Sequence, residues 1–129
     1  MISYALYIID DEEKIRESLS MALEGEYSIK TFAEGKGAVK GIEDDPPDLV
    51  LLDIGLPEMN VIEVLKKIKN FDPHFVVIMI SAYEDTETVI SAMKCGGYDY
   101  VVTRIDMVSL YITLENALDT IRLYIEVQG

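Results

Sequence analysis

The 129-residue chain is long enough for one domain with a single sizeable core, and half of its residues are hydrophobic. Its formal net charge of −13 argues against binding of nucleic acid by this segment through phosphate contacts. The single cysteine, Cys95, excludes an internal disulfide and fits a reducing cytosol. No basic segment precedes the first apolar run, and no run approaches membrane-spanning length, so we expect a cytoplasmic protein without a signal peptide or membrane span.

Apolar runs typical of buried strands alternate along the chain with amphipathic segments typical of helices. The runs predict strands near residues 4–9, 27–32, 48–52, 75–80 and 98–102. The amphipathic segments predict helices near residues 12–24, 35–44, 58–69, 84–95 and 107–127. This alternation favours a parallel sheet, and right-handed crossovers restrict how the chain winds. We therefore predict a flavodoxin-like, three-layer α/β domain of five βα units, with strand order 2-1-3-4-5.

Two of the predicted helices show a clear apolar face. In the first helix the residues expected to face the core are Ile15, Leu19, Ala22 and Leu23. In the third helix they are Ile62, Leu65 and Ile68, and the lysines expected on the outer face and at the C-terminal end are Lys66, Lys67 and Lys69. Both helices should therefore pack one side on the sheet and expose the other to solvent.

Polar side chains stand where three of the apolar runs end. Asp10 and Asp11 follow the first run, Asp53 follows the third and Ser81 follows the fourth. The carboxyl ends of parallel strands meet at one edge of the sheet, where α/β proteins bind their ligands. The first acidic pair has a second explanation as the N-terminal cap of a helix, but Gly55 and Pro57 separate Asp53 from the next helix. The combination predicts an oxygen-rich site suited to a hard divalent cation.

The last predicted helix carries more apolar residues than one buried face needs. Its core stripe would consist of Leu110, Leu114, Ala117, Leu118, Ile121 and Ile125. The residues that cannot all join this stripe are Val108, Tyr111, Ile112, Leu123, Tyr124 and Val127. They form either scattered exposed groups around a broad buried face, or a surface for a partner or a following domain.

With these motifs in order and at suitable spacing, the sequence resembles the receiver domain of two-component response regulators. The matching stretches are Ile8-Ile9-Asp10-Asp11-Glu12, Asp48-Leu49-Val50-Leu51-Leu52-Asp53, Leu56-Pro57-Glu58-Met59, Ile80-Ser81-Ala82-Tyr83 and Gly97-Tyr98-Asp99-Tyr100-Val101. The resemblance covers nearly the whole chain, so residues 1–129 would form a single receiver domain. It is strongest to receivers attached to AAA+ transcription activators, which makes helix 107–127 a candidate to continue toward an output domain.

The resemblance implies a phosphoprotein of a phosphorelay that regulates transcription, and a regulatory domain that at most catalyses its own phosphoryl transfer and dephosphorylation. Asp53 would accept the phosphoryl group from a sensor histidine kinase or a phosphotransfer protein. Ser81 would donate a hydrogen bond to that group, and Tyr100 would be the switch aromatic. The groups that would hold Mg²⁺ are Asp11, Asp53 and the Gly55 carbonyl directly, and Asp10 largely through water. The face formed by the fourth helix, fifth strand and fifth helix would carry the signal and is a candidate homodimer surface.

The chain departs from the family pattern at three places. Thr103 stands where the family has a lysine that contacts the phosphoryl group, and it offers one neutral hydrogen bond in place of a charge-assisted one. Arg104 replaces the proline that follows, so we expect a trans peptide there. Asn60 and Val61 replace an Asp-Gly turn.

Two functional hypotheses follow from the intact acidic residues and the missing lysine. The first is a phosphorylation-controlled receiver. The second is a phosphate-independent pseudo-receiver, a constitutive interaction module that uses the apolar groups of the last helix together with Ile90. A haloacid-dehalogenase-type hydrolase is disfavoured because Gly55 stands where its second aspartate belongs. A flavodoxin is disfavoured because the acidic residues after the first strand would repel a phosphate.

Overall fold

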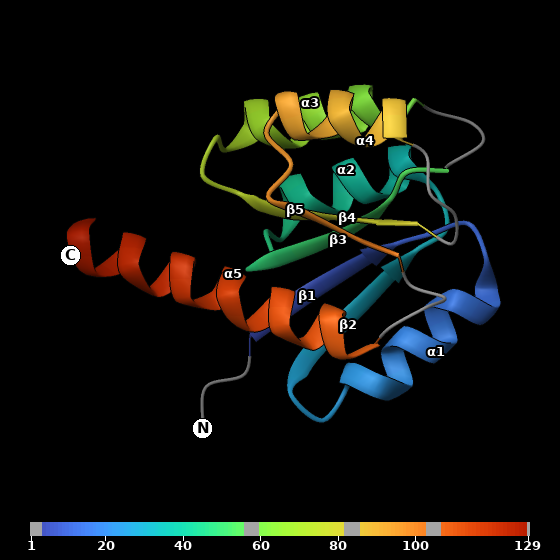
Figure 1. The fold of residues 1–129 in the computed structure, drawn as a ribbon, viewed down its shortest axis with the longest axis horizontal. Coiled ribbons are helices and arrows are strands. Elements are labelled where there is room, and N and C mark those ends of the chain that lie inside the picture. The colour runs from blue at the N-terminus through green and yellow to red at the C-terminus, as the bar shows by residue number, and fades with distance from the viewer. Residues whose placement is uncertain (1–3, 56–59, 82–85, 103–106, 129) are drawn as a thin grey trace.

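The structure, a computed structural model, describes residues 4–55, 60–81, 86–102 and 107–128. Its strands are β1 (Tyr4–Ile9), β2 (Tyr27–Phe32), β3 (Leu49–Asp53), β4 (Val76–Ser81) and β5 (Asp99–Val102). Its helices are α1 (Glu13–Leu23), α2 (Gly35–Asp44), α3 (Val61–Phe71), α4 (Thr86–Lys94) and α5 (Met107–Gln128). All strand pairs are parallel and the sheet order is β2-β1-β3-β4-β5, which confirms the predicted topology (Figure 1).

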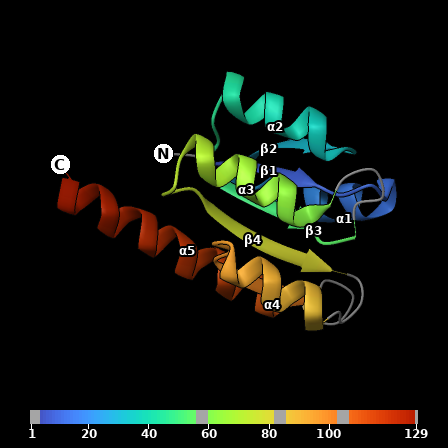
Figure 2. The same cartoon turned by 90° about the horizontal axis from the view of Figure 1, so that it is seen from above.

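The sheet lies between two helical layers, as predicted. Helices α1 and α5 cover one face, and α2, α3 and α4 lie side by side over the other (Figures 1 and 2). On the first face Leu19 and Leu23 of α1 and Leu114 of α5 pack against buried residues of the central strands. On the second face Leu65 of α3 and Ala92 of α4 pack against the opposite side chains of the same strands. Each face therefore has its own hydrophobic core.

The central strands owe their position to their composition. Every residue of β3 and β4 is buried, because helices cover both faces of a parallel sheet and leave no solvent side. The edge strand β2 instead alternates between buried or half-buried and exposed residues over most of its length. The polar residues that end the central strands, Asp53 and Ser81, are themselves the last residues of β3 and β4, one position further than the sequence predicted.

The largest boundary error concerns α3, which the sequence predicted over 58–69. The helix begins at Val61 because the Asn60 side chain accepts a hydrogen bond of 2.8 Å from the Ile62 amide and caps its first turn. It continues to Phe71, two residues beyond the prediction. Residues 58 and 59 lie outside the described part of the chain.

Two predicted helix faces need correction. Leu19 and Leu23 occupy the core-facing stripe of α1, but Ala22 beside them is exposed. Lys69 lies in the last turn of α3, as predicted, but it is half-buried rather than on the outer face, and its Nζ donates a hydrogen bond of 2.7 Å to the Phe75 carbonyl. Burial lowers the pKa of this ammonium, with the Asp72 charge opposing the shift. Lys69 thus ties the end of α3 to the connection before β4.

Helix α5 follows the predicted division between buried and exposed residues. The stripe is buried at Leu110, Leu114, Ala117 and Leu118 and half-buried at Ile121. Val108, Ile112 and Leu123 are exposed, and the Tyr111 hydroxyl donates a hydrogen bond of 3.1 Å to the Ala22 carbonyl of α1. The C-terminal part of α5 projects past the sheet (Figure 1), while its side chains from 124 onward lie outside the described ones. Among the described residues no helix combines the length and apolarity that a membrane span needs.

Candidate functional site

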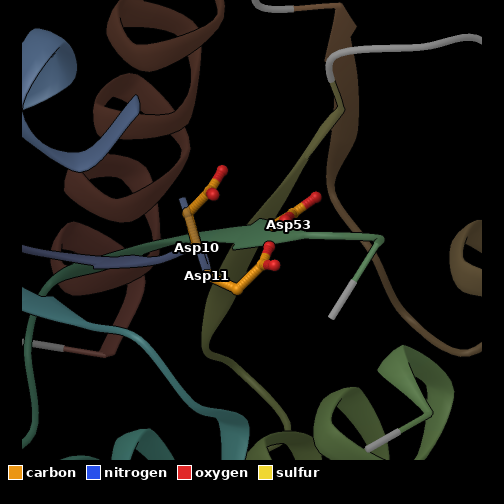
Figure 3. Close-up of side chains that lie close together, drawn as sticks. All are labelled: Asp10, Asp11 and Asp53. Carbon is orange, nitrogen blue, oxygen red and sulfur yellow. The ribbon is translucent and has the colours of Figure 1, made fainter. Parts of the chain in front are cut away.

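The sheet topology brings the predicted acidic residues together. β1 and β3 are neighbours, and the chain leaves them toward opposite faces, through α1 on one side and α3 on the other (Figure 1). The pairing of Ile9 with Leu52 places Asp10 and Asp53 next to each other just beyond the last paired residues. Figure 3 shows Asp10, Asp11 and Asp53 gathered at this edge. It is the topological switch point at which open α/β sheets bind ligands.

The three carboxylates form one cluster. One oxygen from each of Asp10, Asp11 and Asp53 lies within 4.8 Å of the others. Asp10 and Asp53 are buried, with exposed fractions of 5% and 8%, while Asp11 is exposed. Such a set of oxygen ligands, with waters completing the coordination, suits Mg²⁺.

Backbone amides hold the two buried carboxylates in place. Asp10 Oδ1 accepts a hydrogen bond of 2.9 Å from the Glu12 amide. Asp53 Oδ1 accepts one of 2.9 Å from the Gly55 amide, which ties the loop after β3 to the carboxylate. A carboxylate has several acceptor positions, so these amide hydrogen bonds do not exhaust its capacity to bind a cation.

Electrostatics disfavour full ionisation of the cluster. Burial, opposed by the Glu12 amide and reinforced by the Asp11 charge, raises the pKa of Asp10 to about 6. Burial also raises the pKa of Asp53 to about 7. The Gly55 amide opposes this shift, and the charge of Asp10 together with the hydrogen bond and charge of Asp11 adds to it. A divalent cation would relieve both the desolvation and the repulsion, so the donor set fits a hard metal ion.

Arg16 is a residue of the site that the sequence analysis missed. Its Nη1 donates a hydrogen bond of 2.8 Å to the Asp10 carbonyl, and its charge lowers the pKa of Asp10. The charges that act on Asp53 within the described part of the chain, those of Asp10 and Asp11, are negative. The sequence does show a cation one turn into the helix that follows the acidic pair. Which way this side chain points, however, depends on the path of the folded loop.

The other predicted site residues lie around the cluster to different extents. Ser81 ends β4, the strand beside β3, and is buried with an exposed fraction of 7%. Gly55 follows β3 and is exposed. Tyr100 lies in β5 opposite Met79, and its side chain is outside the described ones. Thr103 and Arg104 lie outside the described residues, so the consequences of the missing lysine and proline stay predictions.

The chain belongs to the response regulator receiver domain family, whose model matches residues 6–115. This confirms the family resemblance and makes the chain a receiver domain of the two-component response regulator type. Members of the family are regulatory domains that bind Mg²⁺ at an acidic pocket and interact with histidine kinases or phosphotransfer proteins.

Similar proteins are regulatory and transcriptional regulatory proteins. The chain is 36% identical over 115 residues to the regulatory protein AtoC of Escherichia coli, a match that covers 88% of the chain and 25% of AtoC. It is 35% identical over 130 residues to the nitrogen assimilation regulatory protein NtrX of Azorhizobium caulinodans, covering 98% of the chain and 29% of that protein. The chain thus spans only about a quarter of the length of AtoC and of the similar regulator ZraR of Klebsiella oxytoca.

Solved structures show the same relationship. A crystal structure of NtrX from Brucella abortus superposes with a TM-score of 0.90 at 31% identity, covering 98% of this chain and 30% of that one. The isolated receiver domain of the same NtrX gives a TM-score of 0.83 at 32% identity and covers 89% of this chain and 98% of that one. Both confirm the receiver fold over almost the entire chain.

Proposed function

We propose that Asp53 is the phosphoryl acceptor of this receiver domain, and that its donor is a phosphohistidine on a sensor histidine kinase or a phosphotransfer protein. The observation that carries this proposal is the position of Asp53 at the switch point, with carboxylate oxygens of Asp10 and Asp11 within 4.8 Å. Family membership supplies the reaction class, and the buried carboxylate supplies a nucleophile of the right type.

The transfer needs one oxygen of Asp53 to form a bond to phosphorus while the bond between phosphorus and the histidine nitrogen breaks. The product is an acyl phosphate, and the histidine nitrogen keeps the electron pair. The Gly55 amide donates a hydrogen bond of 2.9 Å to Asp53 Oδ1 and so orients the carboxylate for the attack. Because the attacking carboxylate must be ionised, a pKa of about 7 makes the reaction depend on positive charge at the site.

The ligands we propose for Mg²⁺ are Asp11, Asp53 and the Gly55 carbonyl directly, and Asp10 largely through water. Bound by these groups, Mg²⁺ would supply the positive charge that offsets the negative charge of the carboxylates and of the incoming phosphoryl group. Asp10 is fixed by the Glu12 amide and suits a contact through water. Asp11 is exposed and can turn toward the ion.

We propose that Ser81 and Tyr100 respond to phosphorylation of Asp53. The α4-β5-α5 face then transmits the signal to a partner. Helices α4 and α5 flank the edge strand β5 from opposite faces of the sheet (Figure 1). Ile90 of α4 and Val108 and Ile112 of α5 are exposed apolar residues in this region, as a contact surface or a homodimer would need. We place residues 1–129 as the receiver of a longer, cytoplasmic transcriptional regulator, with α5 leading toward its output domain.

The experiment is intact mass after incubation with acetyl phosphate and Mg²⁺, with Asp53→Asn as the variant and Asp48→Asn as the matched control. Asp48 precedes β3 at the other edge of the sheet, where its carboxylate accepts the Ala5 amide. We expect one phosphoryl group on the native chain and on Asp48→Asn, released by hydroxylamine as an acyl phosphate requires, and none on Asp53→Asn.

The outcome also decides between the two hypotheses for this receiver. A folded native chain that gains no phosphoryl group would contradict the proposal and favour the phosphate-independent interaction module. That module predicts a concentration-dependent association through the exposed apolar residues of α5 that Asp53→Asn leaves unchanged. Sedimentation of the native chain and of Asp53→Asn over a range of concentrations distinguishes them.

A further inference from the structure

Arg16 makes a contact that the proposed phosphoryl transfer does not use. It lies in the second turn of α1, and its side chain is half-buried. The guanidinium reaches back over the connection between β1 and α1, where Nη1 donates a hydrogen bond of 2.8 Å to the Asp10 carbonyl. A guanidinium keeps its charge at every physiological pH and holds its donors in a rigid plane, so this contact is well suited to fix a loop.

Asp10 is held by hydrogen bonds at three points. Its amide donates to the Phe32 carbonyl of β2 at 3.0 Å, and its carboxylate accepts from the Glu12 amide at 2.9 Å. The third bond is the one from Arg16 to its carbonyl. The partners in the first two bonds are main-chain groups, which any residue supplies. The third depends on the Arg16 side chain.

The carbonyl that Arg16 holds belongs to the peptide unit joining Asp10 to Asp11. This unit is planar, so a fixed carbonyl oxygen fixes the plane and the position of the Asp11 Cα. Asp11 is the exposed member of the carboxylate cluster. Its alignment with the two buried carboxylates therefore depends on the peptide that Arg16 holds.

We propose that Arg16 is a positioning residue of the acidic site: by holding the peptide between Asp10 and Asp11, it keeps their carboxylates arranged with Asp53 for Mg²⁺. This rests on the proposed metal binding. The positive charge of Arg16 opposes the binding of another cation, whereas its hydrogen bond favours it. The two contributions have opposite signs. The direction in which the Mg²⁺ affinity changes when Arg16 is replaced therefore shows which of them is larger.

The test compares Mg²⁺ affinity, from NMR titrations of the labelled protein, between the native chain, Arg16→Gln and Lys14→Gln. Lys14 lies on the same helix, is exposed and loses the same charge in its variant. We expect Lys14→Gln to bind Mg²⁺ equally or slightly more tightly. We expect Arg16→Gln to bind about 10-fold more weakly, at the lower end of the range for residues that support metal ligands.

A second readout needs no metal. In the metal-free protein, solvent exchange of the Glu12 amide reports whether the hydrogen bond to Asp10 Oδ1 persists. We expect exchange to be several-fold faster in Arg16→Gln and unchanged in Lys14→Gln. Arg16→Lys keeps a charged donor of shorter reach, so both readouts should fall between those of the native chain and Arg16→Gln. It also serves as the test variant if Arg16→Gln does not fold.

The proposal requires that Arg16→Gln both bind Mg²⁺ more weakly and exchange the Glu12 amide faster than the native chain. Arg16→Gln binding Mg²⁺ as tightly as the native chain, or retaining the native exchange rate of Glu12, overturns the positioning role. If the native chain itself fails to bind Mg²⁺, the proposed metal site is wrong, while the metal-free exchange still shows whether Arg16 holds the loop.

Discussion

Polar groups lie in opposite environments at the two ends of the sheet, the carboxyl edge where the strands end and the amino edge where they begin. At the carboxyl edge, Asp10 and Asp53 are buried close to Asp11, and burial together with like charges raises the pKa of Asp53 to about 7. At the amino edge, tyrosines join the strands to α5 through hydrogen bonds and ring contacts. The unfavourable electrostatics are thus concentrated where the proposed chemistry takes place.

The contacts of the amino edge are stabilising ones. Arg122 donates a hydrogen bond of 3.3 Å to the Tyr4 hydroxyl and lies over its ring. Tyr27 is buried, and burial together with the Glu115 charge raises its pKa to about 12, so it stays neutral at physiological pH. This edge should contribute stability that depends little on pH, whereas the stability of the carboxyl edge should depend strongly on it.

The largest expected effect is a gain of stability on removing the proposed acceptor. Asp53→Asn should raise the free energy of unfolding at pH 8 by about 2–3 kcal/mol, since the pKa of Asp53 rises from 3.8 to about 7 and one unit corresponds to about 1.4 kcal/mol. This value is lower than the pKa shift multiplied by about 1.4 kcal/mol per unit would give, because the three carboxylates share the repulsion. Urea unfolding followed by circular dichroism measures it, and a destabilised variant at pH 8 would contradict the comparison.

The raised pKa values determine whether the free energy of unfolding rises or falls with pH. The native pKa values of Asp10 and Asp53 lie above their ordinary values, so between about pH 4 and 7 the native state keeps protons that the unfolded state has released. The free energy of unfolding of the metal-free native chain should therefore fall as pH rises through this window. The gain from Asp53→Asn should vanish near pH 4. Asp48→Asn should show no gain at either pH, because its carboxylate accepts the Ala5 amide.

Mg²⁺ should raise the free energy of unfolding by offsetting the repulsion among the carboxylates at the carboxyl edge. At a concentration of 100 times its Kd, a ligand that binds only the native state adds about 2.7 kcal/mol to the free energy of unfolding. At pH 5 Mg²⁺ must displace protons from Asp10 and Asp53, so its effect should be clearly smaller than at pH 8. Thermal unfolding at both pH values measures this. Equal stabilisation at pH 5 and pH 8, or in Asp11→Asn, would speak against binding by the carboxylates.

At the turn before β5, Gly96 should show the opposite behaviour, a loss that does not depend on pH. Gly96 has a φ of +105°, and a Cβ there would lie 3.0 Å from Lys69 Cε. Gly96→Ala should lower the free energy of unfolding by about 1–2 kcal/mol with or without Mg²⁺. Gly37→Ala is the matched control, because Gly37 lies in α2 with nothing within 4 Å of an added Cβ. That variant should gain about 0.5–1 kcal/mol.

Most of the fold could be predicted because the central strands carry a strong signal. β3 and β4 are uninterrupted apolar runs that end in Asp53 and Ser81, so their location and their shared edge followed from the sequence. The acidic cluster followed in turn from the strand order.

What the sequence could not supply depends on contacts between distant elements. Helical periodicity placed Lys69 on the outer face or at the C-terminal end of α3, but its hydrogen-bond partner, the Phe75 carbonyl, comes from the connection before β4. Arg16 was missed because its role depends on the path of the folded loop at Asp10. The pKa values of Asp10 and Asp53 depend first on burial, which no spacing in the sequence measures.

The smallest expected effect comes from the tyrosine that joins β5 to α5. The Thr120 hydroxyl donates to the Asn116 carbonyl at 3.1 Å, so its oxygen can only accept from Tyr98, whose hydroxyl lies 3.2 Å away. Tyr98→Phe removes this single neutral hydrogen bond at a partly exposed position and leaves the ring packed on the core. We expect a loss of about 0.5 kcal/mol, equal at pH 5 and pH 8 and unchanged by Mg²⁺.

Urea unfolding of Tyr98→Phe under these conditions, compared in parallel with Asp53→Asn, tests the contrast between the edges most closely. A loss that changed with Mg²⁺ would mean that the tyrosine contact responds to the acidic site, and the two edges would then be coupled through β5 and α5. A loss that stays constant supports the distinction, because a neutral hydrogen bond has no charge through which the titration of Asp10 and Asp53 could act on it.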